Sequence, residues 1–177
     1  MEICVFAQDK SLDIQSCLEQ FMIEHDSLRQ THIGEKYPVR FQAVTLEGDT
    51  ISEKSLEGKV TLFNFWFETC APCMAELGEL NRLYDKLKTN SEFQFISFST
   101  DDVEDIKRVI QKYQLRFPVC PISREEAYRL NLNSGFPTNI VIDRTGMIIY
   151  LKSGGAVEEK RVKKQIKEIE QLIRSKL

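Results

Sequence analysis

Histidine and cysteine, the residues that most often bind zinc or build a disulfide framework, are scarce in this chain. Its 177 residues include two histidines and five cysteines. The histidines, His25 and His32, both lie near the start, and only two of the cysteines are close together in sequence. These counts exclude a zinc finger and a small cystine-stapled scaffold. Because the number of cysteines is odd, at least one thiol stays unpaired within the chain.

A basic excess and a long apolar run are also missing. The 24 lysines and arginines are outnumbered by 27 aspartates and glutamates, and the formal net charge is −3. A nucleic-acid-binding domain would need a basic excess, so nucleic acid is not an expected partner. No apolar run approaches the roughly 18 residues of a membrane span, so none is predicted. The length and the 42% hydrophobic content suit one globular domain with additions.

The first 36 residues are predicted to form an N-terminal helical extension. Apolar side chains recur every three or four residues from Ser11 to Thr31, which predicts an amphipathic helix. Cys17 lies on its apolar stripe and is expected to be buried. The short apolar segment from Ile3 to Ala7 is either the ordinary start of a chain or the end of a truncated secretion signal.

Residues 37–177 are predicted to form an α/β domain with a mixed sheet. Alternating apolar residues from Val39 to Thr45, a Glu-Gly-Asp turn and a return at Ile51 predict a β-hairpin. The apolar segments 60–67 and 93–98 suit strands that are buried on both faces. Helices are predicted over 72–87, 101–113 (with Asp101 as N-cap and Glu104 completing a capping box), 124–130 and 157–177, and strands over 138–142 and 147–151. This order predicts a central mixed sheet that is flanked by helices on both faces.

The motif Cys70-Ala71-Pro72-Cys73 lies where a buried strand gives way to a helix. The unpaired N–H groups and positive dipole end of a helix N-terminus favour a thiolate over a thiol. Two cysteines three residues apart across the first turn can close a small disulfide, and proline is tolerated in that turn. Cys70 precedes the helix and is expected to be exposed and to attack. Cys73 lies on the apolar stripe and is expected to resolve the mixed disulfide.

A zinc site and a pair of inert core cysteines are both less consistent with this motif than a redox pair. A zinc site needs four ligands, and the chain has no second Cys-x-x-Cys motif and no histidine after His32. Two inert core cysteines would both lie on the apolar stripe, whereas Cys70 precedes it. Redox chemistry is therefore favoured. Cys4, Cys17 and Cys120 are expected to be bystanders, with a regulatory or additional resolving role for Cys120 as the alternative.

The segment 64–76, with the sequence NFWFETCAPCMAE, resembles the strand, Cys-x-x-Cys motif and helix start of the thioredoxin superfamily. It is most similar to the TlpA/ResA-like branch of extracytoplasmic thiol–disulfide oxidoreductases. The segment 135–138 (GFPT) resembles the cis-proline loop of the family, and the turns at 58–59 and 154–155 also fit. The resemblance covers residues 37–177 and implies a thioredoxin-like fold.

The resemblance also implies roles for single residues. Pro137 would be cis and would pair with an extended substrate chain beside the disulfide, and Phe136 would face the disulfide. Glu76 matches a helix glutamate of the family. It also lies three residues after Cys73 at the border of the apolar stripe. Partial burial there would raise its pKa and allow it to carry the Cys73 proton.

Three residues depart from the family pattern. Thr69 stands where tryptophan is usual, which removes an aromatic wall, and Met74 stands where a basic residue is frequent. Asn64 stands where thioredoxin has its buried acid, and a neutral amide cannot act as the base, so Glu76 remains the candidate. Thr69 and Pro72 are nevertheless expected to contact substrate together with the cis-proline loop.

The combined prediction is an enzyme of cell redox homeostasis that reduces protein disulfides by dithiol/disulfide exchange. It would need no cofactor or metal, and an upstream electron donor would reduce it again. The family branch favours the bacterial periplasm or cell envelope, and a cytoplasmic location remains open. A thiol peroxidase on the same fold would carry proline and threonine where Phe63 and Phe67 stand, and a metal-delivery module usually has Cys-x-x-x-Cys with a distal histidine. Both alternatives are disfavoured.

Overall fold

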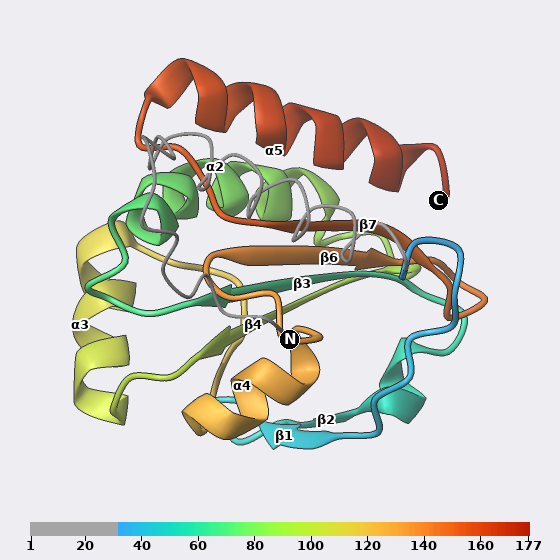
Figure 1. The fold of residues 1–177 in the computed structure, drawn as a ribbon, viewed down its shortest axis with the longest axis horizontal. Helices are drawn as coiled ribbons and strands as arrows, with labels where there is room; N and C mark the ends of the chain where they lie inside the picture. Colours follow the sequence, from blue (N-terminus) through green and yellow to red (C-terminus); the bar gives the residue numbers. More distant parts are fainter. Residues whose placement is uncertain (1–31) are drawn as a thin grey trace, which may run out of the picture. The chain divides into compact units, whose positions relative to one another are not determined.

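The structure, a computed structural model, describes residues 32–177. The predicted helix 11–31, the segment 3–7 and the bystander cysteines Cys4 and Cys17 lie outside these residues. The described elements are β1 (Gln42–Val44), β2 (Thr50–Ser52), the short 3-10 helix η1 (Glu53–Leu56), β3 (Val60–Trp66), α2 (Ala71–Leu87), β4 (Phe93–Ser99), α3 (Val103–Tyr113), β5 (Val119–Pro121), α4 (Arg124–Leu130), β6 (Thr138–Ile142), β7 (Ile148–Ser153) and α5 (Glu159–Arg174) (Figure 1). Each predicted helix and strand of residues 37–177 is present, with its ends shifted by a few residues.

The central sheet is mixed, as predicted. Its strand order is β5-β4-β3-β6-β7, and β3 is parallel to β4 but antiparallel to β6. β7 returns antiparallel to β6 and forms one edge of the sheet. β1 and β2 form the separate hairpin. All seven residues of β3 are buried, because both faces of this strand are covered.

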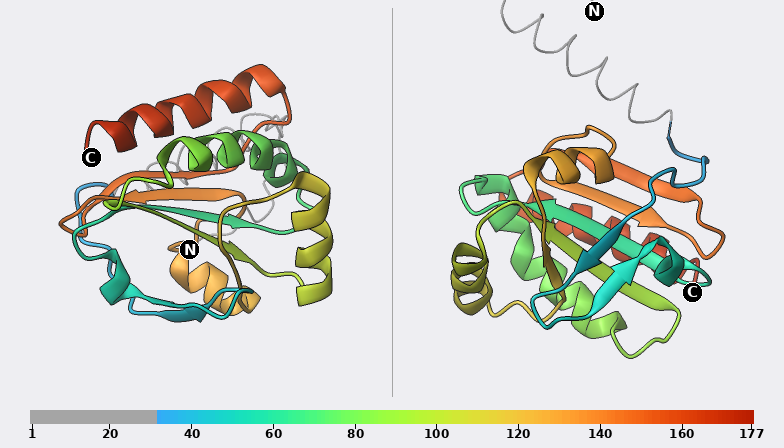
Figure 2. Two further views of the ribbon diagram at one scale, coloured as in Figure 1. Left: turned by 180° about the vertical axis from the view of Figure 1, so that it is seen from behind. Right: turned by 90° about the horizontal axis from the view of Figure 1, so that it is seen from below.

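Different elements cover the two faces of the sheet. α2 and α5 lie over one face, and α4 and the β1–β2 hairpin lie against the other (Figures 1 and 2). Successive side chains of a strand point to opposite faces. Leu62 and Trp66 of β3 therefore join the core under α2, whereas Phe63 and Phe65 join the core on the α4 side. Asn64, between Phe63 and Phe65, lies on the same face as Leu62 and Trp66 and faces α2.

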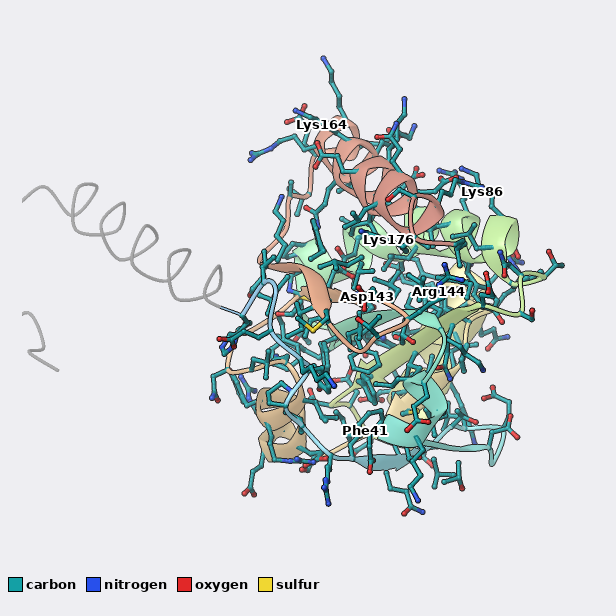
Figure 3. All side chains as sticks on the ribbon, turned by 90° about the vertical axis from the view of Figure 1, so that its right-hand side faces the viewer. Phe41, Lys86, Asp143, Arg144, Lys164 and Lys176 are labelled. Atoms are coloured by element: carbon teal, nitrogen blue, oxygen red, sulfur yellow. A yellow bond between two sulfur atoms is a disulfide. The ribbon has the colours of Figure 1, made fainter. Side chains whose placement is uncertain are left out.

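The C-terminal helix α5 packs through the apolar stripe that the sequence predicts. Its residues Val162, Ile166, Ile169 and Ile173 are all buried in the core shared with α2. The opposite face is charged, and the Lys164 side chain extends away from the sheet (Figure 3). None of the helices in residues 32–177 combines the length and the apolar character needed to cross a bilayer.

The predicted capping box at the start of α3 is wrong. The N-cap is Asp102, and it makes no side-chain cap hydrogen bond. The Asp101 carboxylate instead accepts hydrogen bonds from the Glu68 N–H at 2.6 Å and from the Ser99 hydroxyl at 3.2 Å. Asp101 thereby ties the loop before Cys70 to the end of β4. The Asp101 side chain, which the local sequence predicts to cap α3, is thus used for a contact with a loop that is distant in sequence.

Candidate redox site

The fold places the two cysteines of the motif at the N-terminus of α2, directly after the central strand β3. Cys70 is the N-cap of α2, and Pro72 lies in the first turn. Cys70 and Cys73 form a disulfide with a Cα–Cα distance of 5.2 Å, and Figure 3 shows this bond in yellow. The Cys73 N–H donates to the Cys70 sulfur at 3.3 Å. The described structure is therefore the oxidised form of the pair.

Cys70 is less exposed than the sequence predicts. Its side chain retains 7% exposure, and Cys73 has none. Cys70 belongs to the apolar core under α2, and Phe67, Phe136 and Met74 pack against this core. The order of accessibility agrees with the predicted roles, but the prediction of an exposed Cys70 is wrong. The Cys70 sulfur therefore has to react with a substrate disulfide from a largely apolar environment in which little of Cys70 is exposed.

The cis-proline loop lies against the cysteine motif. The Phe136–Pro137 peptide bond is cis, as the resemblance implied. A Cβ atom added to Gly155 would lie 3.0 Å from Pro137 Cγ and 3.3 Å from Pro72 Cβ. Gly155 therefore has both prolines as immediate neighbours, and the Gly154 N–H donates to the Pro137 carbonyl at 2.8 Å. These contacts join three separate chain segments beside the disulfide.

The other two predicted substrate contacts lie at the rim of this site. Thr69 is exposed directly before Cys70, and Phe136 is half-buried directly before Pro137. The Phe136 ring packs edge-on against Phe67, with ring centres 5.2 Å apart. The site is thus bordered by aromatic rings from the loop after β3 and from the cis-proline loop, even though tryptophan is missing at position 69.

Glu76 is buried more deeply than its place at the border of the stripe suggests. Its side chain is 2% exposed. Its carboxylate accepts one hydrogen bond from the Asn64 amide at 2.8 Å and others from the Asn139 amide, the shorter at 3.1 Å. Burial raises the pKa of Glu76 to about 7, and the two amides and the more distant Lys152 oppose a larger rise. Glu76 can therefore gain or lose a proton near neutral pH.

Polar side chains from four strands form a row beneath Glu76. Asn64 of β3 is paired in register with Ser97 of β4 and with Asn139 of β6, and Asn139 is paired with Lys152 of β7. The Asn64 amide also donates to the Asn139 side-chain oxygen at 3.0 Å, and the Ser97 hydroxyl donates to Asn64 at 3.4 Å. The row runs from the interior of the sheet to Lys152, which is exposed on the edge strand.

Comparison with known proteins agrees with this geometry. A family model described as the AhpC/TSA family matches residues 33–151. The chain belongs to the AhpC/TSA family. The match includes the cysteine motif, the cis-proline loop and the strands that carry the polar row.

Several curated relatives of this family member are named thiol–disulfide oxidoreductases. The chain is similar to thiol–disulfide oxidoreductase ResA of Bacillus cereus, at 32% identity over 118 residues that cover 66% of this chain and 67% of the relative. ResA of Halalkalibacterium halodurans is 30% identical over 125 residues, which cover 68% of this chain and 69% of the relative. The predictions of a ResA-like protein and of thiol–disulfide oxidoreductase chemistry are confirmed by these relatives.

Solved structures confirm the thioredoxin-like fold of this family member. The thioredoxin domain of a thiol–disulfide oxidoreductase from Bacteroides vulgatus superposes with a TM-score of 0.62 at 23% identity, covering 77% of this chain and 96% of that chain. StoA from Bacillus subtilis superposes with a TM-score of 0.59 at 22% identity, covering 73% and 96% respectively.

Sequence reasoning missed Asn139 and Ser97, both of which belong to the polar row. Each is a polar residue within an otherwise apolar strand, and buried polar groups nearly always have hydrogen-bond partners. That signal could have indicated a buried polar cluster. It could not have identified Glu76 as the acceptor, because the register between β3 and β6 is not visible in sequence.

In residues 32–177, no three histidine, cysteine, aspartate or glutamate side chains are grouped so that they could hold a metal ion. The third cysteine of this region, Cys120, is a buried free thiol in the core on the α4 side. Burial raises the pKa of Cys120 to about 12, and Glu47 adds to the rise. A neutral buried thiol is a poor nucleophile.

We therefore expect Cys120 to stay unmodified in the folded protein. At pH 8 the reduced protein should be alkylated by iodoacetamide at Cys70 within minutes, whereas Cys120 should react only after unfolding in guanidinium. Peptide-level mass spectrometry separates the individual cysteines. Rapid alkylation of Cys120 in the folded protein would contradict its assignment as a bystander.

Proposed function

We propose that this protein reduces disulfides in other proteins, with Cys70 as the attacking thiolate and Cys73 as the resolving thiol. The observation that carries the proposal is the Cys70–Cys73 disulfide at the N-terminus of α2, with the cis Phe136–Pro137 loop beside it. The helix N-terminus supplies unpaired N–H groups and a positive dipole end for a thiolate. The higher exposure of Cys70 relative to Cys73 supports the order of the two steps.

The reaction proceeds through a mixed disulfide. The Cys70 thiolate attacks one sulfur of the substrate disulfide, and the other substrate sulfur leaves as a thiolate that takes up a proton. The Cys73 sulfur then attacks Cys70, which releases the second substrate thiol and closes the protein disulfide. Two electrons pass from the protein to the substrate, and an upstream dithiol donor must return them.

Glu76 is proposed to accept the proton that Cys73 loses in the second step. It follows Cys73 by three residues on α2, so the two side chains lie on adjacent turns of one helix face. Its pKa of about 7 suits reversible proton transfer at neutral pH. Asn64 and Asn139 hold its carboxylate in place.

The substrate chain is proposed to bind in extended form along the loop before Pro137. An extended peptide can pair with an exposed backbone segment of a protein through main-chain hydrogen bonds. Phe136, Thr69 and Pro72 surround this position and would contact side chains on either side of the substrate cysteine.

We infer the direction of the reaction from how little the side chains around Cys70 add to the stabilisation that the helix N-terminus gives its thiolate. Strong oxidants of this fold owe their potential to a stabilised reduced form. Here Pro72 has no N–H, Ala71 has no polar side chain, and the first turn of α2 contains no charged residue. A weakly stabilised dithiol is a better electron donor, which supports a reductant.

We place this activity outside the cytoplasm, in the bacterial periplasm or cell envelope. The support is the resemblance to the extracytoplasmic TlpA/ResA-like branch. Disulfides form and persist in such oxidising compartments, so a reductant there has substrates to act on.

The midpoint potential of the Cys70–Cys73 pair tests this function. Equilibration with dithiothreitol buffers should give a potential closer to about −270 mV, as for thioredoxin, than to about −120 mV, as for a strong oxidant. The protein should also accelerate the reduction of insulin by dithiothreitol. A potential above about −180 mV would contradict a reductive role.

A further inference from the structure

Three aromatic rings and one arginine form a continuous surface beside the cysteine motif. We call Phe67, Phe136, Tyr128 and Arg124 the aromatic ledge. Phe136 packs edge-on against Phe67 and against Tyr128, with ring centres 5.2 Å and 5.7 Å apart. All three rings are half-buried, so each keeps part of its surface open to a partner.

Two residues of the ledge are connected through the backbone to the cysteine motif and to the cis-proline. The Phe67 carbonyl accepts a hydrogen bond from the Cys70 N–H at 3.1 Å. Phe136 is joined to the cis-proline, whose ring lies beside Pro72 across Gly155. The side chains next to the reacting cysteine of a bound polypeptide would therefore lie within reach of the ledge.

The guanidinium group of Arg124 lies over two of these rings. Its Cζ atom is 5.9 Å from the ring centre of Phe67 and 5.8 Å from that of Tyr128, within the range of cation–π attraction. A guanidinium group carries five N–H donors, which lie in its plane. Those donors remain able to bind a carboxylate in bidentate fashion.

The acidic residues that neighbour Phe67 and Arg124 in sequence do not neutralise Arg124. Glu68 is paired with Arg108, and Glu126 is paired with Arg129. Glu125 is the next residue of α4, and residues one apart on a helix do not face each other. Across residues 32–177, no carboxylate lies within ion-pair distance of Arg124. The ledge thus presents one exposed, ring-supported positive charge beside the disulfide.

We infer that the aromatic ledge selects polypeptide disulfides that carry an aspartate or glutamate close to the reacting cysteine. The rings would take an apolar neighbour of that cysteine, and Arg124 would bind the carboxylate. This inference rests on the proposed disulfide reductase function and specifies its substrate class. Arg124 is then a specificity-determining residue, because it contacts the substrate without taking part in the exchange of sulfur bonds.

Two matched peptides test this selectivity. Both carry phenylalanine next to one cysteine, which is activated as a pyridyl disulfide, and they differ only in aspartate or asparagine three residues away. The reduced protein converts each to the free peptide thiol and pyridine-2-thione, while its own two thiols become the disulfide. With pre-reduced protein, no other thiol present and the peptide in excess, absorbance of the thione released in a single turnover gives kcat/KM from the dependence of the rate on peptide concentration.

The wild-type protein is expected to favour the aspartate peptide about tenfold in kcat/KM, as one charge-assisted pair near the surface can provide. Arg124→Gln should bring the ratio to within about twofold of one, and Arg124→Glu should reverse it, since like charges repel. Raising the salt concentration should lower the wild-type ratio. Arg129→Gln, which removes a charge from the same helix, should keep the wild-type ratio.

The outcomes separate this inference from the proposed function. If the wild-type protein reduces neither peptide, the proposed function fails. If it reduces both at equal rates, or if Arg124→Gln keeps the full preference, the function stands and the selectivity is overturned. A ratio of rates is insensitive to partial unfolding, and thermal unfolding curves check that each variant is folded.

Discussion

Replacing Cys70 by serine is expected to abolish catalysed disulfide reduction. A serine hydroxyl is not ionised at neutral pH and cannot form a disulfide, so no mixed intermediate can arise. In the insulin assay the rate should fall to that of dithiothreitol alone. Cys120→Ala is the matched control, because it removes a buried thiol from the opposite core, and it should keep wild-type activity.

Replacing Cys73 by serine should have a different effect. Attack by Cys70 remains possible, but the second step is lost, so mixed disulfides with substrate should accumulate and appear on non-reducing gels. Full activity of Cys70→Ser would disprove the mechanism. Trapping by Cys70→Ser instead of Cys73→Ser would reverse the two roles.

Replacing Glu76 by glutamine is expected to change how the stability of the oxidised protein depends on pH. Burial raises the pKa of Glu76 from 4.5 to about 7. Between these values the folded state holds a proton that the unfolded state has released, so the free energy of unfolding falls as the pH rises. The loss amounts to about 3 kcal/mol by pH 8, at 1.36 kcal/mol per pKa unit.

A glutamine at this position stays neutral and avoids that loss. The difference in free energy of unfolding between Glu76→Gln and wild type should therefore widen by about 3 kcal/mol from pH 4.5 to pH 8. Urea unfolding at several pH values measures it. Glu79→Gln changes a carboxylate on the same helix that is ion-paired with Arg82, and it should keep the wild-type profile. If the free energies of unfolding of Glu76→Gln and wild type changed in parallel with pH, a raised pKa of Glu76 would be refuted.

The cysteine motif and its helix are predictable because their determinants are local. An apolar strand of seven residues, a helix-tolerated proline and an apolar stripe through Cys73 and Leu77 are adjacent in sequence. The depth of Glu76 is not local. It depends on Asn139, which is 63 residues away and reaches Glu76 only because β6 pairs with β3 in one particular register.

The two incorrect predictions have the same kind of cause. Asp101 has the residue type of an N-cap, but the Glu68 N–H, from a loop 33 residues earlier, binds its carboxylate instead. Cys70 precedes the helix stripe, yet Phe136 from the cis-proline loop packs against the core that covers it. In both cases a segment distant in sequence competes with a local pattern that would be sufficient in an isolated helix.

The tight fit of Gly155 has a consequence for when the site becomes complete. The walls around the disulfide come from residues 70–73, from Pro137 and from Gly155, so they span half of the chain. During synthesis residues 70–73 leave the ribosome well before residue 155 does. A nascent or truncated chain that ends before Gly155 lacks one wall of the site as well as α5. The site is therefore complete only in molecules in which residue 155 has been synthesised and lies against the two prolines.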